Sequence, residues 1–228
     1  MSRQVRIPWQ REHPFRYAIT EWLVDLDKTA LLLMDFQAAY VRPDVGLGPA
    51  LARDFPREHA YYYGRLRDVV IPNAVRLLHA FRELAQPVVF TRLGTMLPGG
   101  RDLPPWSWRS RALEARYARG DREYEIVPEL APGPDDLVID RPTLNPFNAS
   151  PLDQVLRNMG VENLAVAGVQ TEGAPESAAR SAAERGYTVF VLEDGCATLD
   201  PAEQEATFQG LSWAAARSTD ELLALVAR

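Results

Sequence analysis

The stretch that decides the fold is residues 163–198, NLAVAGVQTEGAPESAARSAAERGYTVFVLEDGCAT. Apolar, β-branched runs at Asn163–Ala167 and Thr188–Leu192 are typical of buried strands. Between them, Pro175–Arg185 has a helical pattern that opens with proline, and Gly186 follows where a helix C-cap is expected. A strand, a helix and a second strand in this order predict a parallel strand–helix–strand unit.

The same alternation extends over the rest of the chain. It predicts an α/β fold: a Rossmann-like three-layer sandwich with a six-stranded parallel sheet and helices on both faces. The further strands are expected at Thr29–Met34, Pro87–Thr91, Asp136–Ile139 and, as a short sixth, Ala214–Arg217, and the further helices at Arg65–Leu84, Pro151–Met159, Pro201–Leu211 and Thr219–Val226.

The composition narrows the class of protein. The 228 residues include 46% hydrophobic and 25% charged side chains, with a net charge of −6, which is typical of a globular domain and unfavourable for binding nucleic acid. No apolar run reaches the length of a membrane span, and the first residues lack the apolar core of a signal peptide, so we expect a cytoplasmic protein without membrane contact. Cys196 is the single cysteine, and the three histidines share no helix face as metal ligands. We expect neither a metal ion nor a cofactor.

Two long segments interrupt the alternation of strands and helices. We expect loops at Val41–Tyr63 and Leu93–Glu125, both rich in arginine, proline, glycine and aromatic residues. Such loops either build and cover a site at the carboxyl ends of the strands or form oligomer contacts. Trp106 and Trp108, in the second segment, are accordingly either a pocket lid or an interface patch.

The beginning of the chain differs from the rest. Residues 1–27 hold four large aromatic side chains between Trp9 and Trp22, more than a free tail usually carries. We therefore divide the chain into an N-terminal arm, 1–27, and an α/β domain, 28–228. The arm is expected to pack on this subunit or on a neighbouring one.

Four sequence blocks carry a resemblance to a known family. They are TALLLMDFQ (29–37), VIDRPTLNPF (138–147), LAVAGVQTEGAPESAARSAAERGYTVFVLEDGCAT (164–198) and RSTDELLALV (217–226). In this order and spacing the chain resembles the isochorismatase-like hydrolases, also called the cysteine hydrolase family, over roughly residues 28–226. The resemblance implies a six-stranded parallel sheet and hydrolysis of amides, carbamoyl compounds or ureides, or, in some members, of the vinyl ether of isochorismate.

The resemblance also implies a catalytic triad, and two of its positions are substituted here. The amidohydrolases of the family use an Asp base, a Lys and a Cys nucleophile, and these positions fall on Asp35, Arg141 and Ala174. Alanine has no group that attacks a carbonyl, and arginine stays protonated and relays no proton. Cys196 lies one strand away from the crevice and is expected to be a small buried hydrophobe.

Other parts of the family's machinery are expected to persist. A non-proline cis peptide of the family falls on Val169–Gln170. Ala174 lies at a helix N-terminus, where free backbone N–H groups and the helix dipole favour a developing oxyanion. Arg141 is either a structural partner that depresses the pKa of Asp35 or a bidentate clamp for a substrate carboxylate.

Eight side chains around this crevice are assigned to substrate binding. Glu172 is either a residue at the lip of the crevice that faces the ligand or only a negative charge that stabilises a helix N-terminus. Thr171 and Gln170 either support the turn or contact the ligand, and Phe147 and Asn148 match the pocket-lining segment that the resemblance implies. The full set is Gln37, Trp106, Trp108, Phe147, Asn148, Gln170, Thr171 and Glu172.

Two functions from different classes are open at this point. In the first, a cysteine-independent enzyme uses Asp35 as general acid or base on a small polar metabolite that Arg141 orients, in a hydrolysis or a related acid–base step. In the second, a pseudoenzyme binds a ligand or a partner protein without turnover. A tight Asp35–Arg141 pair favours base chemistry or loss of activity over acid catalysis. The resemblance also implies a homodimer or a homotetramer.

Overall fold

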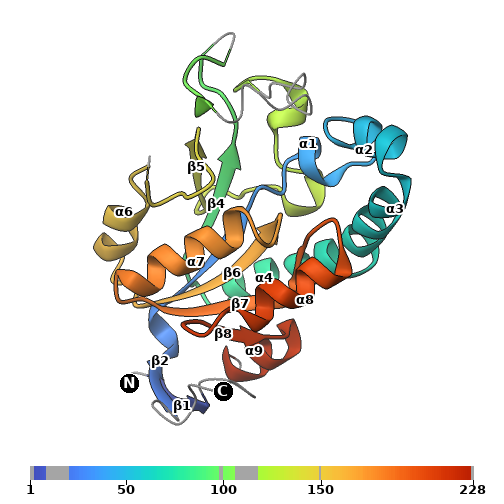
Figure 1. The fold of residues 1–228 in the computed structure, drawn as a ribbon. Helices are drawn as coiled ribbons and strands as arrows, with labels where there is room; N and C mark the ends of the chain where they lie inside the picture. The colour runs from blue at the N-terminus through green and yellow to red at the C-terminus, as the bar shows by residue number, and fades with distance from the viewer. Residues whose placement is uncertain (1–2, 9–20, 98–99, 106–117, 149, 227–228) are drawn as a thin grey trace.

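The computed structural model describes residues 3–8, 21–97, 100–105, 118–148 and 150–226. At its centre, six parallel strands form one sheet in the order β5-β4-β3-β6-β7-β8 (Figure 1). This arrangement confirms the predicted α/β fold. The strands are β3 (Thr29–Met34), β4 (Val88–Leu93), β5 (Leu137–Arg141), β6 (Asn163–Val169), β7 (Thr188–Ala197) and β8 (Ala215–Arg217).

Part of the segment expected to be a loop before residue 64 is helical instead. Pro56 starts a helix because its fixed φ suits the first helical position. Tyr62, Leu66 and Val70 then continue one buried face at four-residue spacing. The expected helix at 65–84 is therefore the second half of a longer one, which passes through a π-helical turn. The described α-helices are α1 (Ala38–Val41), α2 (Gly48–Asp54), α3 (Pro56–Arg65), α4 (Ile71–Glu83), α6 (Leu152–Asn158), α7 (Ala174–Glu184), α8 (Pro201–Gln209) and α9 (Thr219–Val226), with the π-helical turn at Leu66–Val70 and 3-10 helices at Leu26–Lys28, Arg122–Tyr124 and Pro128–Leu130.

The central strand β3 shows why the sheet is covered on both faces. Its whole sequence, TALLLM, is buried, and successive side chains of a strand point to opposite faces. Leu31 and Leu33 belong to the apolar cluster that contains the buried residues of α4 and α9. Leu32 and Met34 belong to the cluster that contains those of α6 and α7.

Strand β7 is longer than predicted, and the extra length places Cys196 inside the sheet. Val166 of β6 pairs with Val191, but Gly168 pairs with Cys196, so the register shifts between the two pairs. At Gly168 the φ is +153°, and an added Cβ would lie 2.4 Å from the carbonyl oxygen of Met34. Only glycine fits this close approach of β6 to β3.

Two further strands lie in the segment that was assigned to an arm. Strands β1 (Gln4–Pro8) and β2 (Glu21–Asp25) pair antiparallel, next to the sheet edge where β3 begins (Figure 1). Ile7 and Val24 are buried in the same apolar cluster as Leu31. None of the described helices has the length and apolarity needed to cross a membrane.

Candidate functional site

The candidate site begins where the central strand β3 ends. Asp35 follows Met34, and its backbone N–H donates to the carbonyl of Thr91 at 3.0 Å, which ties it to the neighbouring strand β4. Its φ of +59° lies in the left-handed region, which is uncommon for a residue other than glycine but tolerated by aspartate. The side chain is buried, so a charged group lies at the carboxyl edge of an apolar sheet.

A buried arginine pairs with this carboxyl group. Arg141 is the last residue of β5, two strands away from β3, and its Nη2 donates to Asp35 Oδ1 at 2.6 Å and to Oδ2 at 2.5 Å. Thr91, on the strand between them, donates its hydroxyl to Asp35 Oδ1 at 3.3 Å. The structure therefore brings together two of the three predicted triad positions as a tight pair.

Burial and the guanidinium act on the Asp35 pKa in opposite directions. Burial raises the pKa because the charged form loses its hydration, whereas the charge and hydrogen bonds of Arg141 lower it. Arg141 thus lowers this pKa as expected, but the net direction is upward, because desolvation outweighs the contribution of the guanidinium. Both carboxyl oxygens nevertheless accept from a guanidinium that stays protonated, which is the geometry of an ionised carboxylate.

The remaining donors of Arg141 decide what else it can hold. Its Nη1 donates to the carbonyl of Thr143, and its Nε is buried without a hydrogen-bond partner among the described residues. The Nη2 that a bidentate clamp would direct at a substrate carboxylate is instead used on Asp35. The N–H of Nε is therefore available to another group.

The third triad position offers no side-chain chemistry. Ala174 is buried as the first residue of α7, which follows the cis peptide Val169–Gln170 that the resemblance implies. In the first turn of α7, Pro175 has no N–H, and the N–H groups of Glu176 and Ser177 donate to carbonyls of the preceding turn. Among the first four residues of α7, only the backbone N–H of Ala174 is therefore free to bind an oxyanion.

The single thiol lies nearby but is enclosed by the protein. Cys196 is fully buried in β7 beside Gly168 of β6. Burial raises the pKa of this thiol to about 12, so the thiol form persists at neutral pH. A thiol in this state is a small buried hydrophobe.

Some predicted binding residues are occupied with supporting the protein. Gln37 is fully buried, and its side chain bonds to the backbone of Leu93 and to the carbonyl of Tyr124, which anchors the loop before β5. Thr171 is buried and bonds through its hydroxyl to Gln204 of α8 at 2.7 Å. Any contact of either residue with a ligand stays a prediction.

The other predicted binding residues have different contacts or lie outside the described residues. Phe147 packs against Tyr187 at 6.2 Å between ring centroids, and Arg185 stacks on it at 5.0 Å. Both neighbours follow the C-terminal end of α7, whereas Ala174 is at its beginning, and a contact of Phe147 with a ligand stays a prediction. Asn148 is exposed, and Gln170, half-buried, accepts from the N–H of Gly173. Trp106 and Trp108 lie outside the described residues.

Two buried tyrosines that are not among the predicted site residues lie within electrostatic reach of Asp35. Tyr62 is fully buried, and the negative charges of Glu172 and Asp35 add to burial in raising its pKa. Asp35 likewise contributes to a raised pKa of Tyr124. The sequence signal for Tyr62 is the apolar spacing of α4, which continues towards the N-terminus into α3, beyond the predicted start of the helix at residue 65.

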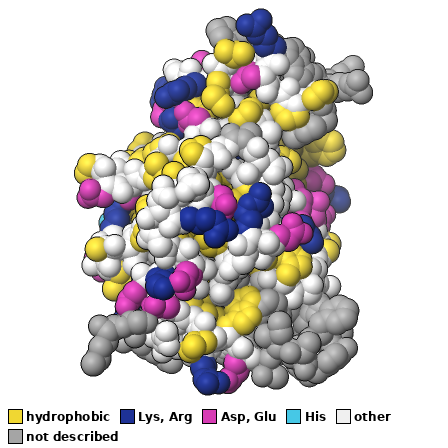
Figure 2. All heavy atoms as spheres, turned by 90° about the vertical axis from the view of Figure 1, so that its left-hand side faces the viewer, with side chains coloured by type: hydrophobic (Ala, Val, Ile, Leu, Met, Phe, Trp, Pro, Cys, Tyr) yellow, Lys and Arg dark blue, Asp and Glu magenta, His cyan; other side chains and the backbone are white. Residues whose placement is uncertain are grey.

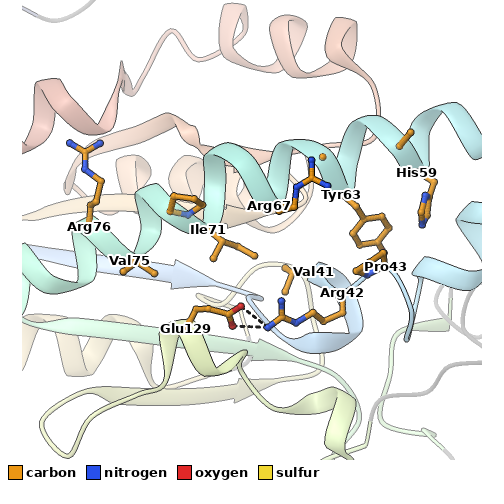
Figure 3. A pocket seen from close by; sticks show the side chains of 13 residues that line it. Val41, Arg42, Pro43, His59, Tyr63, Arg67, Ile71, Val75, Arg76 and Glu129 are labelled. Carbon is orange, nitrogen blue, oxygen red and sulfur yellow. Dashed lines mark hydrogen bonds and ion pairs between the residues drawn. The ribbon is translucent and has the colours of Figure 1, made fainter.

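A separate groove lies on the outer side of α3 and α4. Its volume is about 1070 Å³, and Figure 3 shows Val41, Tyr63, Ile71 and Val75 between several charged side chains. Arg42 and Glu129 face each other across one side of it, at 2.6 and 2.8 Å. The predicted site residues do not line this groove. Within the described ranges, no cluster of His, Cys, Asp or Glu is suited to hold a metal ion.

Fold and site together define a parallel α/β domain with a buried acidic residue at the carboxyl end of its central strand. The Isochorismatase domain profile matches residues 29–221. The chain therefore belongs to the isochorismatase family, which confirms the resemblance that the four sequence blocks carry.

Characterised relatives and solved structures point the same way. Ureidoacrylate amidohydrolase RutB of Pseudomonas syringae pv. syringae (strain B728a) is 30% identical over 197 residues, covering 79% of this chain and 76% of RutB. A cysteine hydrolase from Pseudomonas syringae pv. phaseolicola 1448A has a TM-score of 0.76 at 22% identity and covers 90% of this chain and 95% of that chain. N-carbamoylsarcosine amidase from Thermoplasma acidophilum has a TM-score of 0.64 at 21% identity and covers 85% and 97%. The two solved structures show the shared fold.

Proposed function

We propose that this chain is a hydrolase of small polar metabolites that works without a cysteine nucleophile, with Asp35 as its general base and Arg141 orienting the substrate. The observation that carries the proposal is the buried Asp35–Arg141 pair at the carboxyl end of β3. A buried ion pair is a weak source of stability, because desolvation of both charges offsets their attraction. Its place at the edge where parallel α/β domains bind ligands supports a role in chemistry.

The state of Asp35 suits a base better than an acid. Arg141 holds it as a carboxylate, and burial raises its pKa, which makes that carboxylate a stronger base than an exposed one. Its Oδ1 already accepts from Arg141 and Thr91, whereas Oδ2 accepts from Arg141 alone. Oδ2 therefore retains capacity to accept a hydrogen bond from water.

The proposed reaction follows from these contacts. A water molecule bonded to Asp35 Oδ2 gives up a proton to the carboxylate as its oxygen forms a bond to the substrate carbonyl carbon. The free Nε–H of Arg141 orients the carbonyl group. Collapse of the tetrahedral intermediate breaks the bond to the leaving nitrogen or oxygen. Relatives named as amidohydrolase and amidase make amides and ureides the first substrates to screen.

The test is turnover of a panel of amides, ureides and enol ethers by the wild type and by Asp35→Asn. We expect kcat/KM on the best substrate to fall about 10²–10⁴-fold in Asp35→Asn, because the base is lost. Glu129→Gln is the control, since it neutralises another arginine-paired carboxylate outside the site. Equal loss in both variants, or none in Asp35→Asn, contradicts the proposal. Absence of turnover on the whole panel favours a binding protein, which the alanine at position 174 also fits.

A further inference from the structure

Two residues that line the groove on the outer side of α3 and α4 carry buried polar atoms without a hydrogen-bond partner among the described residues. The atoms are Nε2 of His59 and the hydroxyl oxygen of Tyr63. Buried polar groups are nearly always bonded, because an unbonded one loses its hydration without compensation. Two such atoms in one groove indicate a place for a ligand that bonds to both.

The two side chains lie next to each other and face the groove. Their ring centroids are 4.8 Å apart, and Figure 3 shows both rings extending from α3 towards the segment that carries Pro43. Tyr63 is only 7% exposed, and burial raises its pKa, so its hydroxyl stays protonated and can donate a hydrogen bond. The imidazole of His59 can also donate from Nε2. This end of the groove is therefore suited to an acceptor such as a carboxylate.

The groove follows one stripe of a continuous helical run, from α3 through the π-helical turn into α4. The stripe consists, at four-residue spacing, of His59, Tyr63, Arg67, Ile71 and Val75. At a rise of about 1.5 Å per residue it is roughly 24 Å long. Hydrogen-bond donors occupy its first part and apolar side chains its second part. The groove therefore matches an elongated ligand with one polar and one apolar end.

The charges along the groove favour an anionic ligand. The charged side chains that line it are Arg42, Arg67, Arg76 and Glu129. Arg42 and Glu129 neutralise each other, whereas Arg67 and Arg76 pair with exposed acids that do not line the groove. An exposed ion pair contributes little free energy, so Arg67 can turn from Asp68 to a ligand at small cost. The groove thus has an excess of positive charge next to the two unbonded donors.

The other end of the groove is suited to a hydrocarbon chain. Figure 3 shows Ile71 and Val75 on one wall and Val41 on the opposite wall. The volume of about 1070 Å³ lies near the upper end of the range for small-molecule sites. Each methylene group that a ligand buries on such a surface strengthens binding by about fourfold.

We infer that this groove is a binding site for a small amphipathic carboxylate, such as a straight-chain fatty acid. The carboxylate accepts hydrogen bonds from Tyr63 and His59 beside Arg67, and the chain lies along Ile71 and Val75. The inference goes beyond the proposed function and does not depend on it, because Asp35 and Arg141 do not line the groove.

The test is isothermal titration calorimetry of the wild type with decanoate, at concentrations at which decanoate is monomeric. We expect one decanoate per chain, and affinity that falls about fourfold for each methylene group removed in octanoate and hexanoate. Decanol should bind more weakly, and decylamine should not bind, because its charge has the wrong sign. Equal binding of decanoate, decanol and decylamine would overturn the inference, since the groove would then select the chain alone.

Tyr63→Phe tests the unbonded hydroxyl, and Tyr62→Phe is its matched control. Tyr62 is the preceding residue and also has a buried, unbonded hydroxyl, but it does not line the groove. We expect decanoate to bind about 10- to 100-fold more weakly to Tyr63→Phe, because a hydrogen bond to a charged group is lost, and equally well to Tyr62→Phe. Without decanoate, Tyr63→Phe should be no less stable to urea than the wild type. A less stable variant with unchanged affinity would give the hydroxyl a structural role and overturn the inference.

Arg67→Gln tests the charge, with Arg53→Gln as its control. Arg53 pairs with the next residue, Asp54, at 2.7 Å, as Arg67 does with Asp68 at 2.6 Å, but it does not line the groove. We expect decanoate to bind about two- to fivefold more weakly to Arg67→Gln, most clearly at low salt, and equally well to Arg53→Gln. Equal affinity of both variants would remove Arg67 from the site and contradict the inference.

Two further measurements separate this site from other uses of the groove. Asp35→Asn should bind decanoate as the wild type does, whatever its turnover. Loss of binding in Asp35→Asn would place decanoate in the candidate active site and overturn the inference, without bearing on the proposed function. Sedimentation velocity tests for a second copy of the chain in the groove. If decanoate does not bind and Val75→Arg dissociates an oligomer, the groove is an interface between copies and the inference is wrong.

Discussion

Two arginine–carboxylate pairs in this molecule have nearly the same contact distances and very different surroundings. Arg141 and Asp35 are joined at 2.5 and 2.6 Å, with both side chains at most 3% exposed. Arg42 and Glu129 are joined at 2.6 and 2.8 Å on the rim of the outer groove, with side chains 34% and 42% exposed. Geometry alone does not distinguish these pairs.

Their effects on the carboxyl groups are opposite. Arg42 lowers the pKa of Glu129, because solvent keeps the desolvation small and the hydrogen bonds dominate. The pKa of Asp35 is raised although its arginine partner is fully buried, because the burial of Asp35 raises the pKa by more than Arg141 lowers it. The degree of hydration therefore decides whether the carboxyl pKa in such a pair is lowered or raised. Burying both charges of a pair costs desolvation free energy, so a buried pair at the edge of the sheet indicates a functional role.

Figure 2 shows the charged side chains on one face of the molecule, with which the buried Asp35–Arg141 pair can be compared. On the face that it presents, lysine, arginine, aspartate and glutamate side chains lie close to one another in small groups of both signs. Pairs of this kind, such as Lys28–Glu162 at 2.5 Å, lie in water with both partners 44% or more exposed. Such exposed pairs contribute little to stability, and the buried Asp35–Arg141 pair differs from them in having no access to solvent.

The largest expected effect comes from removing one partner of the buried pair. Arg141→Met leaves Asp35 as an uncompensated buried charge, so we expect the free energy of unfolding to fall by about 3–5 kcal/mol. Urea denaturation measures it. The double substitution Asp35→Leu with Arg141→Met should recover most of that loss, since no charge remains buried. A loss below about 1 kcal/mol in Arg141→Met would remove the contrast between the pairs.

A second effect is a pH dependence of opposite sign at the two carboxyl groups. The folded-state pKa of Asp35 is raised, so its contribution to stability is present below its ordinary value of 3.8 and is lost as the pH rises through the folded pKa. The folded-state pKa of Glu129 is lowered, so its contribution is present above 4.5 and is lost as the pH falls.

The contribution of each carboxyl group is the free energy of unfolding of the wild type minus that of the variant in which the group is replaced by its amide. The stability of the wild type relative to Asp35→Asn should decline with rising pH, and that relative to Glu129→Gln should increase. Chemical denaturation at several pH values between about 3 and about 7, which begins about one unit below the ordinary carboxyl pKa values and extends above them, measures both slopes. Slopes of the same sign would mean that Arg141, not burial, controls Asp35.

The smallest effect on stability is expected on the groove rim. Arg42→Ala breaks an exposed pair, so the free energy of unfolding should change by about 0–1 kcal/mol, and less at high salt. The same urea titration used for Arg141→Met gives the comparison directly. A loss as large as that of Arg141→Met would show that exposure does not separate the two pairs.

Local sequence was sufficient for the sheet and for Asp35 at its edge, whereas the family resemblance was needed to select Arg141 as its neighbour. Buried strands such as β3 and β6 are continuous apolar runs, and Asp35 and Arg141 each stand at the end of one, where parallel strands bring their side chains to the same edge. The polar, aromatic composition before Tyr63 concealed a helix whose signal was the spacing of its buried face.

The rest of the site depends on contacts between distant segments. Nothing in the local sequence indicates that Tyr62 of α3 lies within electrostatic reach of Glu172 at the start of α7. The direction of the Asp35 pKa also required the degree of burial, because a nearby arginine alone favours the opposite direction. Phe147 was assigned by resemblance, and side-chain packing at the other end of α7 decided its position.

The central claim, that this site uses a carboxyl group and no thiol, is tested most directly by kcat/KM of Cys196→Ala on a substrate that the wild type hydrolyses. Because the thiol is fully buried, with its pKa raised to about 12, we expect a value within about twofold of the wild type. A loss of about a hundredfold or more, in a variant that folds normally, would place the sulfur of Cys196 in the reaction and contradict the account.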